Sequence, residues 1–127
     1  MFLTEYLSFL TKTIEEYSKT GLILSSEIKV DSRTEKFGLI KGSIIFHDES
    51  NLYFTEYIDL RYKIEKLTCV FHYQDKDGNL IFRYDDATHK PNLDYKYHKH
   101  AGEKILSSEM PELNNVLEEI ISGLITL

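Results

Sequence analysis

Apolar residues near the start of the chain recur at helical spacing. They fall on one stripe of period 3.6, made up of Leu3, Leu7, Leu10, Ile14 and Tyr17. Gly21 follows this stripe, and glycine is common just past the end of a helix because it adopts positive φ without strain. The pattern predicts a helix over residues 2–19.

After this helix, apolar and polar side chains alternate, which is typical of strands with one covered face. The apolar positions of the successive runs are Leu22, Leu24, Ile28 and Val30; Ile40, Gly42, Ile44 and Phe46; Leu52, Phe54, Ile58 and Leu60; Leu67, Cys69, Phe71 and Tyr73; and Leu80, Phe82 and Tyr84. The alternation predicts about five strands.

The connections between these runs are short and polar. Residues 31–35 and 48–51 carry turn-forming residues, and residues 75–79 contain an Asp-Gly pair, which is a strong hairpin signal. Consecutive hairpins predict an antiparallel meander. Residues 87–101, which include Pro91, are too polar for a core element and are predicted to form an irregular, histidine-rich loop.

A second helical stripe follows Pro111, a residue favoured in the first turn of a helix. This stripe is broad and comprises Leu113, Val116, Leu117, Ile120, Ile121 and Leu124. Two helices can cover one face of the sheet, so the predicted fold is α+β: an N-terminal helix, the meander, the loop and a C-terminal helix. The length of 127 residues predicts a single domain over residues 1–127.

The composition supports a globular protein, with 42% hydrophobic residues, nine tyrosines and seven phenylalanines. No apolar run approaches the length of about 18 residues that spans a membrane, and the N-terminus lacks the features of a signal peptide. Cys69 is the sole cysteine, which excludes an internal disulfide and a multi-cysteine zinc site. We therefore expect a cytoplasmic protein that does not bind membranes.

The net charge of −6 argues against general affinity for nucleic acids, which usually requires a basic surface. The charge is uneven, because residues 89–104 carry a local charge of +2 before any histidine is protonated, which leaves −8 on the remainder. Such a segment favours one short anionic ligand or the acidic surface of a partner.

Most of the residues with functional chemistry lie between residues 72 and 100, where four of the five histidines occur. The strand phase predicts that His72 and Arg83 meet across the Asp-Gly hairpin on the uncovered face of the sheet. On that face the third strand presents Tyr53, Tyr57, Asp59 and Arg61. The alternative is that these side chains form cross-strand pairs with no function beyond the sheet itself.

Glu56 falls in phase with the apolar residues of the third strand. A buried carboxylate needs a partner or an altered pKa, so the pattern predicts one of these. The alternative is a β-bulge that turns Glu56 outward.

His98, Lys99 and His100 support two chemical interpretations. Residues at positions i and i+2 of an extended segment point the same way, so the two imidazoles can chelate a metal, with Asp85, Asp86 or His89 completing the site. Alternatively, one histidine is a general base and another a general acid, while Lys99 or Arg83 neutralises a phosphate. That arrangement serves metal-independent RNA cleavage by the 2′-hydroxyl, with tyrosines stacking on unpaired bases.

We adopt the metal-independent interpretation and assign neither a metal nor a cofactor. The sequence contains no nucleophile elbow, phosphate loop or GxGxxG motif. Catalytic roles are assigned to His72, Arg83, His98, Lys99 and His100. Binding roles are assigned to Tyr57, Tyr84, Asp85, His89 and Lys96.

The same region resembles the TumE-type proteins, described as the toxin halves of two-gene toxin–antitoxin loci. The resemblance rests on residues 71–74 (Phe-His-Tyr-Gln), 78–80 (Gly-Asn-Leu), 83–87 (Arg-Tyr-Asp-Asp-Ala), His89 with Pro91, and 98–100 (His-Lys-His). The chain departs from the family pattern at Asp86, Lys90 and Tyr97, where Asn, His and Pro are usual.

The resemblance implies a toxin held by a helix-turn-helix antitoxin, and by analogy it favours action on RNA. Two other functions remain open, namely a non-catalytic protein-interaction module and a small metal-dependent hydrolase. We expect the antitoxin to cover residues 83–100 and to pair with Lys90, Lys96 or Lys99. The wide stripe of the last helix also suggests self-association, giving a homo-oligomer through the C-terminal helix.

Overall fold

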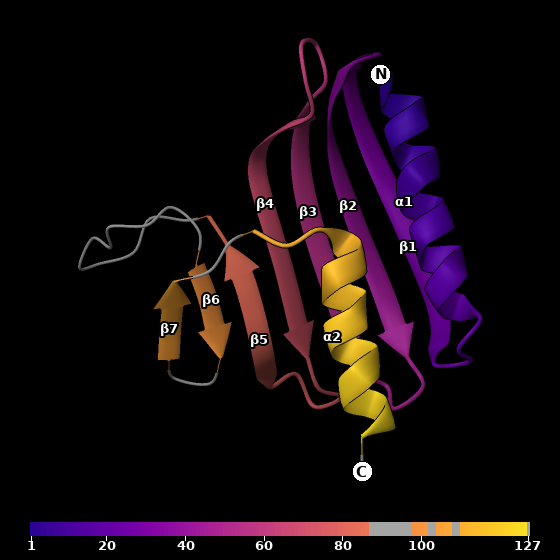
Figure 1. Cartoon of the computed structure of the whole chain (residues 1–127), viewed down its shortest axis with the longest axis vertical. Helices are drawn as coiled ribbons and strands as arrows, with labels where there is room; N and C mark the ends of the chain where they lie inside the picture. The colour runs from indigo at the N-terminus through magenta and orange to yellow at the C-terminus, as the bar shows by residue number, and fades with distance from the viewer. Residues whose placement is uncertain (87–97, 102–103, 108–109, 127) are drawn as a thin grey trace.

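One antiparallel sheet carries both helices on the same face, and its strands lie side by side in chain order (Figure 1). The computed structural model describes residues 1–86, 98–101, 104–107 and 110–126, with side chains at all of these except 98 and 104–107. The elements of this part are α1 (Leu3–Ser18), β1 (Ile23–Thr34), β2 (Phe37–Phe46), β3 (Asn51–Asp59), β4 (Glu65–Gln74), β5 (Leu80–Asp85), β6 (His98–Ala101), β7 (Lys104–Ser107) and α2 (Leu113–Ile125). The α+β prediction is confirmed.

The apolar stripes of the two helices and the helix-facing side of the sheet form one hydrophobic core. The buried residues of the helices are Leu3, Tyr6, Leu10 and Ile14 of α1 and Leu113, Val116, Leu117, Ile120 and Ile121 of α2. Much of the stripe of α2 is therefore used within its own chain, while Ile125 at its end is exposed, and self-association through this helix stays a prediction. No helix in the described ranges is long and apolar enough to cross a membrane.

Gly42 occupies a core-facing position of β2, where the absence of a side chain leaves room for an aromatic ring. It pairs with Phe54 across β2 and β3, and an added Cβ would lie 2.1 Å from the ring of Phe54. Phe54 in turn packs against Phe71 of β4, with ring centroids 6.0 Å apart. A glycine in this strand thus allows two phenylalanines to fill the centre of the core.

The hairpin between β4 and β5 has the predicted turn. Gly78 has φ of 86°, and Asp75 Oδ1 accepts hydrogen bonds of 2.9 Å from the backbone nitrogens of Asp77 and Asn79. The Asp-Gly pair therefore sets the register that brings β4 and β5 together.

The first hairpin differs from its prediction. Residues 31–34, predicted to be part of a loop, belong to β1, and the turn contains only Glu35 and Lys36, between paired Thr34 and Phe37. The side chains of β1 are largely exposed because it is an edge strand, so polar residues do not interrupt it.

Two short strands add to the predicted meander. Residues 98–101, predicted to be part of an irregular loop, form β6, and β7 extends the sheet beyond it. The sequence of β6, His-Lys-His-Ala, has no apolar alternation, so periodicity does not detect it. Residues 87–97 of the predicted loop lie outside the described residues.

The packing at Gly42 predicts opposite effects for the same substitution at two sites. We expect Gly42→Ala to lower the free energy of unfolding by about 1–3 kcal/mol, because the new methyl group overpacks the core. Gly123→Ala is the matched control: it lies in α2 with open space around it and should raise stability by about 0.5–1 kcal/mol. Urea denaturation measures both, and a Gly42→Ala protein as stable as the wild type would contradict the packing described.

Candidate functional site

A row of polar side chains crosses four strands on the face of the sheet away from the helices. Strand pairing places Tyr53 of β3 opposite His72 of β4, His72 opposite Arg83 of β5, and Arg83 opposite His100 of β6. Neighbouring strands lie about 4.8 Å apart, so register alone brings these side chains into contact range. We call Tyr53, His72, Arg83, Asp85 and His100 the open-face cluster.

Hydrogen bonds in the cluster define the tautomer of His72. Arg83 Nη1 lies 3.1 Å from His72 Nδ1, and a guanidinium can only donate, so Nδ1 accepts. The proton of the neutral ring then sits on Nε2, which donates to Gln74 Oε1 at 3.0 Å. His72 is thus held as one tautomer by a donor on one side and an acceptor on the other.

Asp85 joins Arg83 and His100 within the cluster. The residue is 2% exposed, and its Oδ2 accepts a hydrogen bond from Arg83 Nε at 3.1 Å. His100 Nε2 lies 3.1 Å from the same oxygen. Because an unpaired buried carboxylate is strongly destabilising, these contacts fix the positions of both Arg83 and His100.

The cluster is accessible at its edges. The side chain of Arg83 retains 38% of its exposure and that of His100 retains 17%. Tyr53 is an exposed aromatic residue, and its ring centroid lies 6.4 Å from that of His72. The arrangement can therefore present a guanidinium and two imidazoles, with an aromatic surface beside them, to an anionic ligand.

Tyr84 and Lys99, predicted to belong to the site, lie on the opposite face of the sheet. Tyr84 Oη donates to Glu119 Oε1 at 2.6 Å, and Lys99 Nζ donates to Glu119 Oε2 at 2.9 Å. The Lys99 ammonium also lies 4.9 Å from the ring centroid of Tyr84. Burial alone would lower the pKa of Lys99, but its bonds to Tyr84 and Glu119 raise it overall. These residues join β5 and β6 to α2, and the structure does not bring them to the cluster.

The other residues predicted to belong to the site either lie away from the open-face cluster or have side chains outside the described residues. Tyr57 lies on the same strand as Tyr53 but about 13 Å along it, where its ring packs edge-on against Phe37. The backbone of His98 pairs with Asp85, while its side chain lies outside the described residues, as do His89 and Lys96.

Two contacts of His72 were not among the predicted site residues. Tyr53 and Gln74 both occupy positions of their strands that face away from the helices. The alternation of apolar and polar residues therefore predicts the face on which they lie. Selecting Tyr53 over Tyr57 required the register between β3 and β4, which sequence periodicity does not supply.

The described residues contain no group of three histidine, cysteine, aspartate or glutamate side chains placed to hold a metal ion. At the open-face cluster the carboxylate of Asp85 is already bound by Arg83, whose positive charge opposes a nearby cation.

A second polar cluster lies inside the core and involves Glu56. This carboxylate is fully buried, accepts a short hydrogen bond from Tyr6 Oη, and has Lys66 Nζ 3.6 Å from its other oxygen. Lys66 also donates to Glu112 Oε2 at 2.8 Å. The prediction of a buried, partnered Glu56 is thus confirmed, and the bulge alternative is wrong at this position.

Titration in this buried cluster is governed by desolvation. Burial raises the pKa of Glu56, and the ammonium of Lys66 opposes the rise without cancelling it. Burial also raises the pKa of Cys69, opposite Glu56, to about 12, so the thiol stays protonated near neutral pH. Cys69 is therefore not an activated nucleophile.

Comparison with known proteins gives one family match. The model of the family described as Toxin TumE matches residues 10–126, which is nearly the whole chain. No curated protein and no solved structure matches the chain.

The raised pKa of Glu56 predicts a pH-dependent contribution to stability. A carboxyl group whose pKa is higher in the folded than in the unfolded state stabilises the fold at low pH, and this stabilisation is lost as pH rises through the folded pKa. The unfolding free energy of the wild type relative to Glu56→Gln should therefore fall as pH increases above about 4.5. Urea denaturation from pH 2.5 to pH 8 measures the difference.

Asp75→Asn is the control with the opposite sign. Hydrogen bonds from the Asn79 and Asp77 backbone lower the pKa of Asp75, so the wild type should lose stability relative to this variant as pH falls below about 4. A difference between wild type and Glu56→Gln that rises with pH, or does not change, would contradict the desolvation described.

Proposed function

Since this chain belongs to the TumE toxin family and is the toxin of a toxin–antitoxin pair, we propose that it acts by cleaving RNA without a metal ion. The observation that supports this activity is the hydrogen-bonded path from His72 through Arg83 and Asp85 to His100. It places two imidazoles on either side of one guanidinium, on the face of the sheet that the helices leave uncovered. The proposed compartment is the cytoplasm.

The chemistry requires three groups around one phosphodiester. A base takes the proton from the 2′-hydroxyl as its oxygen attacks phosphorus, an acid protonates the leaving 5′-oxygen, and a cation stabilises the charge on the phosphoryl oxygens. The products are a 2′,3′-cyclic phosphate and a free 5′-hydroxyl. No other reactant is consumed in this step.

Each role has a candidate in the open-face cluster. His100, whose Nε2–H is held by the Asp85 carboxylate, is the proposed base, because that contact orients the ring. Arg83 is the proposed phosphate-binding cation. His72 is the proposed proton donor, acting as an imidazolium. When Arg83 turns from His72 Nδ1 to the phosphate, Nδ1 can take up a proton, and the charged ring then donates one to the leaving oxygen.

The spacing of the strands suits this division of roles. His72 and His100 lie two strands apart with Arg83 between them, so their backbones are separated by about 10 Å. A phosphate bound to Arg83 would then have an imidazole on each side. Tyr53 would stack on an adjacent unpaired base. His98, two residues before His100 on β6, is kept as a further candidate for a catalytic role.

We also propose that the antitoxin is a helix-turn-helix protein that covers the open-face cluster. The expected anchors Lys90 and Lys96 lie outside the described residues, and Lys99 is bound to Glu119. Arg83 is therefore the proposed anchor for an acidic segment of the antitoxin, because it combines a permanent charge with partial exposure.

Substitution of either imidazole should remove toxicity. Expression without the antitoxin is expected to stop growth and to leave cleaved RNA, whereas His72→Gln or His100→Gln should restore growth. Loss of a general acid or base costs roughly 10²–10⁴ in rate, so the effect will be clear. His47→Gln, at the exposed turn after β2, is the matched control and should remain toxic.

Growth is read together with soluble protein level and with RNA cleavage by the purified chain in the presence of a chelator. Equal toxicity of wild type, His72→Gln and His100→Gln at equal soluble levels would refute the proposed site. Cleavage that stops on chelation and returns with zinc or manganese would favour the metal-dependent hydrolase instead.

Binding of the antitoxin should protect the cluster from chemical modification. Carbethoxylation by diethylpyrocarbonate, followed by mass spectrometry, is expected to label His72 and His100 less in the complex than in the free chain. His47 should be labelled equally in both, since it lies outside the cluster. Unchanged labelling of His72 and His100 in a stable complex would mean that the antitoxin binds elsewhere.

A further inference from the structure

Strand β1 is a long edge strand of the sheet. It spans twelve residues and is first in the strand order, so among the described residues only β2 pairs with it. Long exposed edge strands are templates for pairing with another strand, and proteins usually shorten or cover them. The regular part of β1 extends from Ser25 to Ser32, with register shifts at both ends.

The outer end of each charged side chain on β1 is exposed, and the charges alternate in sign. Glu27 lies 3.6 Å from Lys29, and Asp31 lies 3.6 Å from Arg33, so the four side chains share one face of the strand. Their side-chain exposures are 59–77%, which makes the pairs within one chain weak.

This charge pattern is complementary to itself when the strand is reversed. In an antiparallel pair of two β1 strands centred on Val30, Lys29 lies opposite Asp31 of the second copy, and Glu27 approaches Arg33 of the second copy, the residue at the register shift. A slip of two residues places Lys29 opposite Lys29 or Asp31 opposite Asp31. A slip of one residue moves the charges to the other face. Only the register centred on Val30 pairs every charge with its opposite.

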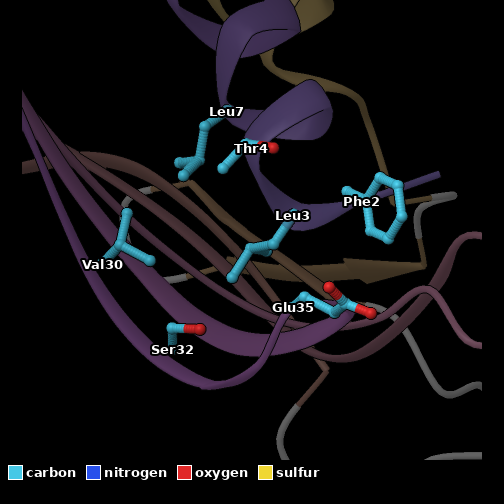
Figure 2. Close-up of a pocket in the computed structure, with 7 residues that line it drawn as sticks. All are labelled: Phe2, Leu3, Thr4, Leu7, Val30, Ser32 and Glu35. Atoms are coloured by element: carbon cyan, nitrogen blue, oxygen red, sulfur yellow. The ribbon is translucent and has the colours of Figure 1, made fainter.

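The helix-facing side of β1 supports the same register. A pocket of about 400 Å³ lies between α1 and β1, and Figure 2 shows Leu3 and Leu7 of α1 facing Val30 across it. Val30 is 39% exposed. In the centred register the second copy places its own Val30 opposite Val30 and its Ile28 opposite Ser32, which also lines the pocket. Apolar side chains would thus be added where the pocket already has an apolar lining.

We infer that β1 is a homodimer interface, at which a second copy of the chain pairs antiparallel about a two-fold axis at Val30. Such an interface is isologous, because each copy contributes the same residues to it. It joins two sheets into one and leaves both open-face clusters on the same side. The inference stands independently of the proposed RNA cleavage, since it rests on β1 and α1 alone.

Charge reversal tests the register directly by sedimentation equilibrium of the purified chain. Lys29→Glu and Asp31→Lys should each raise the dimer dissociation constant about tenfold or more, because each creates two like-charged pairs across the axis. An equimolar mixture of the two variants should regain wild-type affinity. In that heterodimer Glu at position 29 of one copy faces Lys at position 31 of the other, and Asp31 faces Lys29.

Two controls separate this effect from misfolding and from net charge. Lys76→Glu makes the same charge change in the turn between β4 and β5 and should leave the dimer unchanged. The double variant Lys29→Asp with Asp31→Lys exchanges the charges within one chain and should dimerise like the wild type. Circular dichroism shows whether each variant is folded.

Three results would overturn the inference. One is a wild-type chain that stays monomeric at tens of micromolar, and another is association that is equal in both single variants and the wild type. The third is a mixture that associates no better than its components. A monomeric wild type whose antitoxin affinity falls in Lys29→Glu would assign the same edge to the antitoxin.

Discussion

The buried carboxylate of Asp85 fixes the arrangement on which the open-face cluster depends. A charge with 2% exposure requires compensation, and Arg83 and His100 supply it from the same strand and the next one. Arg83 then has a second nitrogen directed at His72, which selects the tautomer of that ring. One buried anion thereby orders three functional groups on three neighbouring strands.

Strand β6, which carries His100, is held in place by contacts on both faces of the sheet. On the open face His100 contacts Asp85, and on the helix face Lys99 contacts Glu119 of α2. A strand of four residues with three polar side chains buries little apolar surface, so these charged contacts take the place of a hydrophobic face. The division also explains why Lys99 supports the site from behind and does not enter it.

The core of the fold and part of the site can be predicted from the periodicity of apolar residues in the sequence. The phase of β2 to β5 predicts the buried face, and the Asp-Gly turn predicts that His72 meets Arg83. Other features depend on partners distant in the chain. Glu56 faces inward because Tyr6 of α1 binds it, β6 has no apolar alternation, and the face of Lys99 is known only once residues 98–101 are recognised as a strand.

The order of the strands has a consequence for synthesis. Because neighbours in the sheet are neighbours in the chain, β1 to β5 can pair as they leave the ribosome. At roughly 5–20 residues per second, the 15 residues from Asp86 to His100 take about 1–3 s to follow. During those seconds the nascent sheet has its apolar side only partly covered, and the second imidazole is not yet part of the chain. A ribosome making this toxin therefore adds the last group proposed to cut RNA only after it has made the strands that position the others.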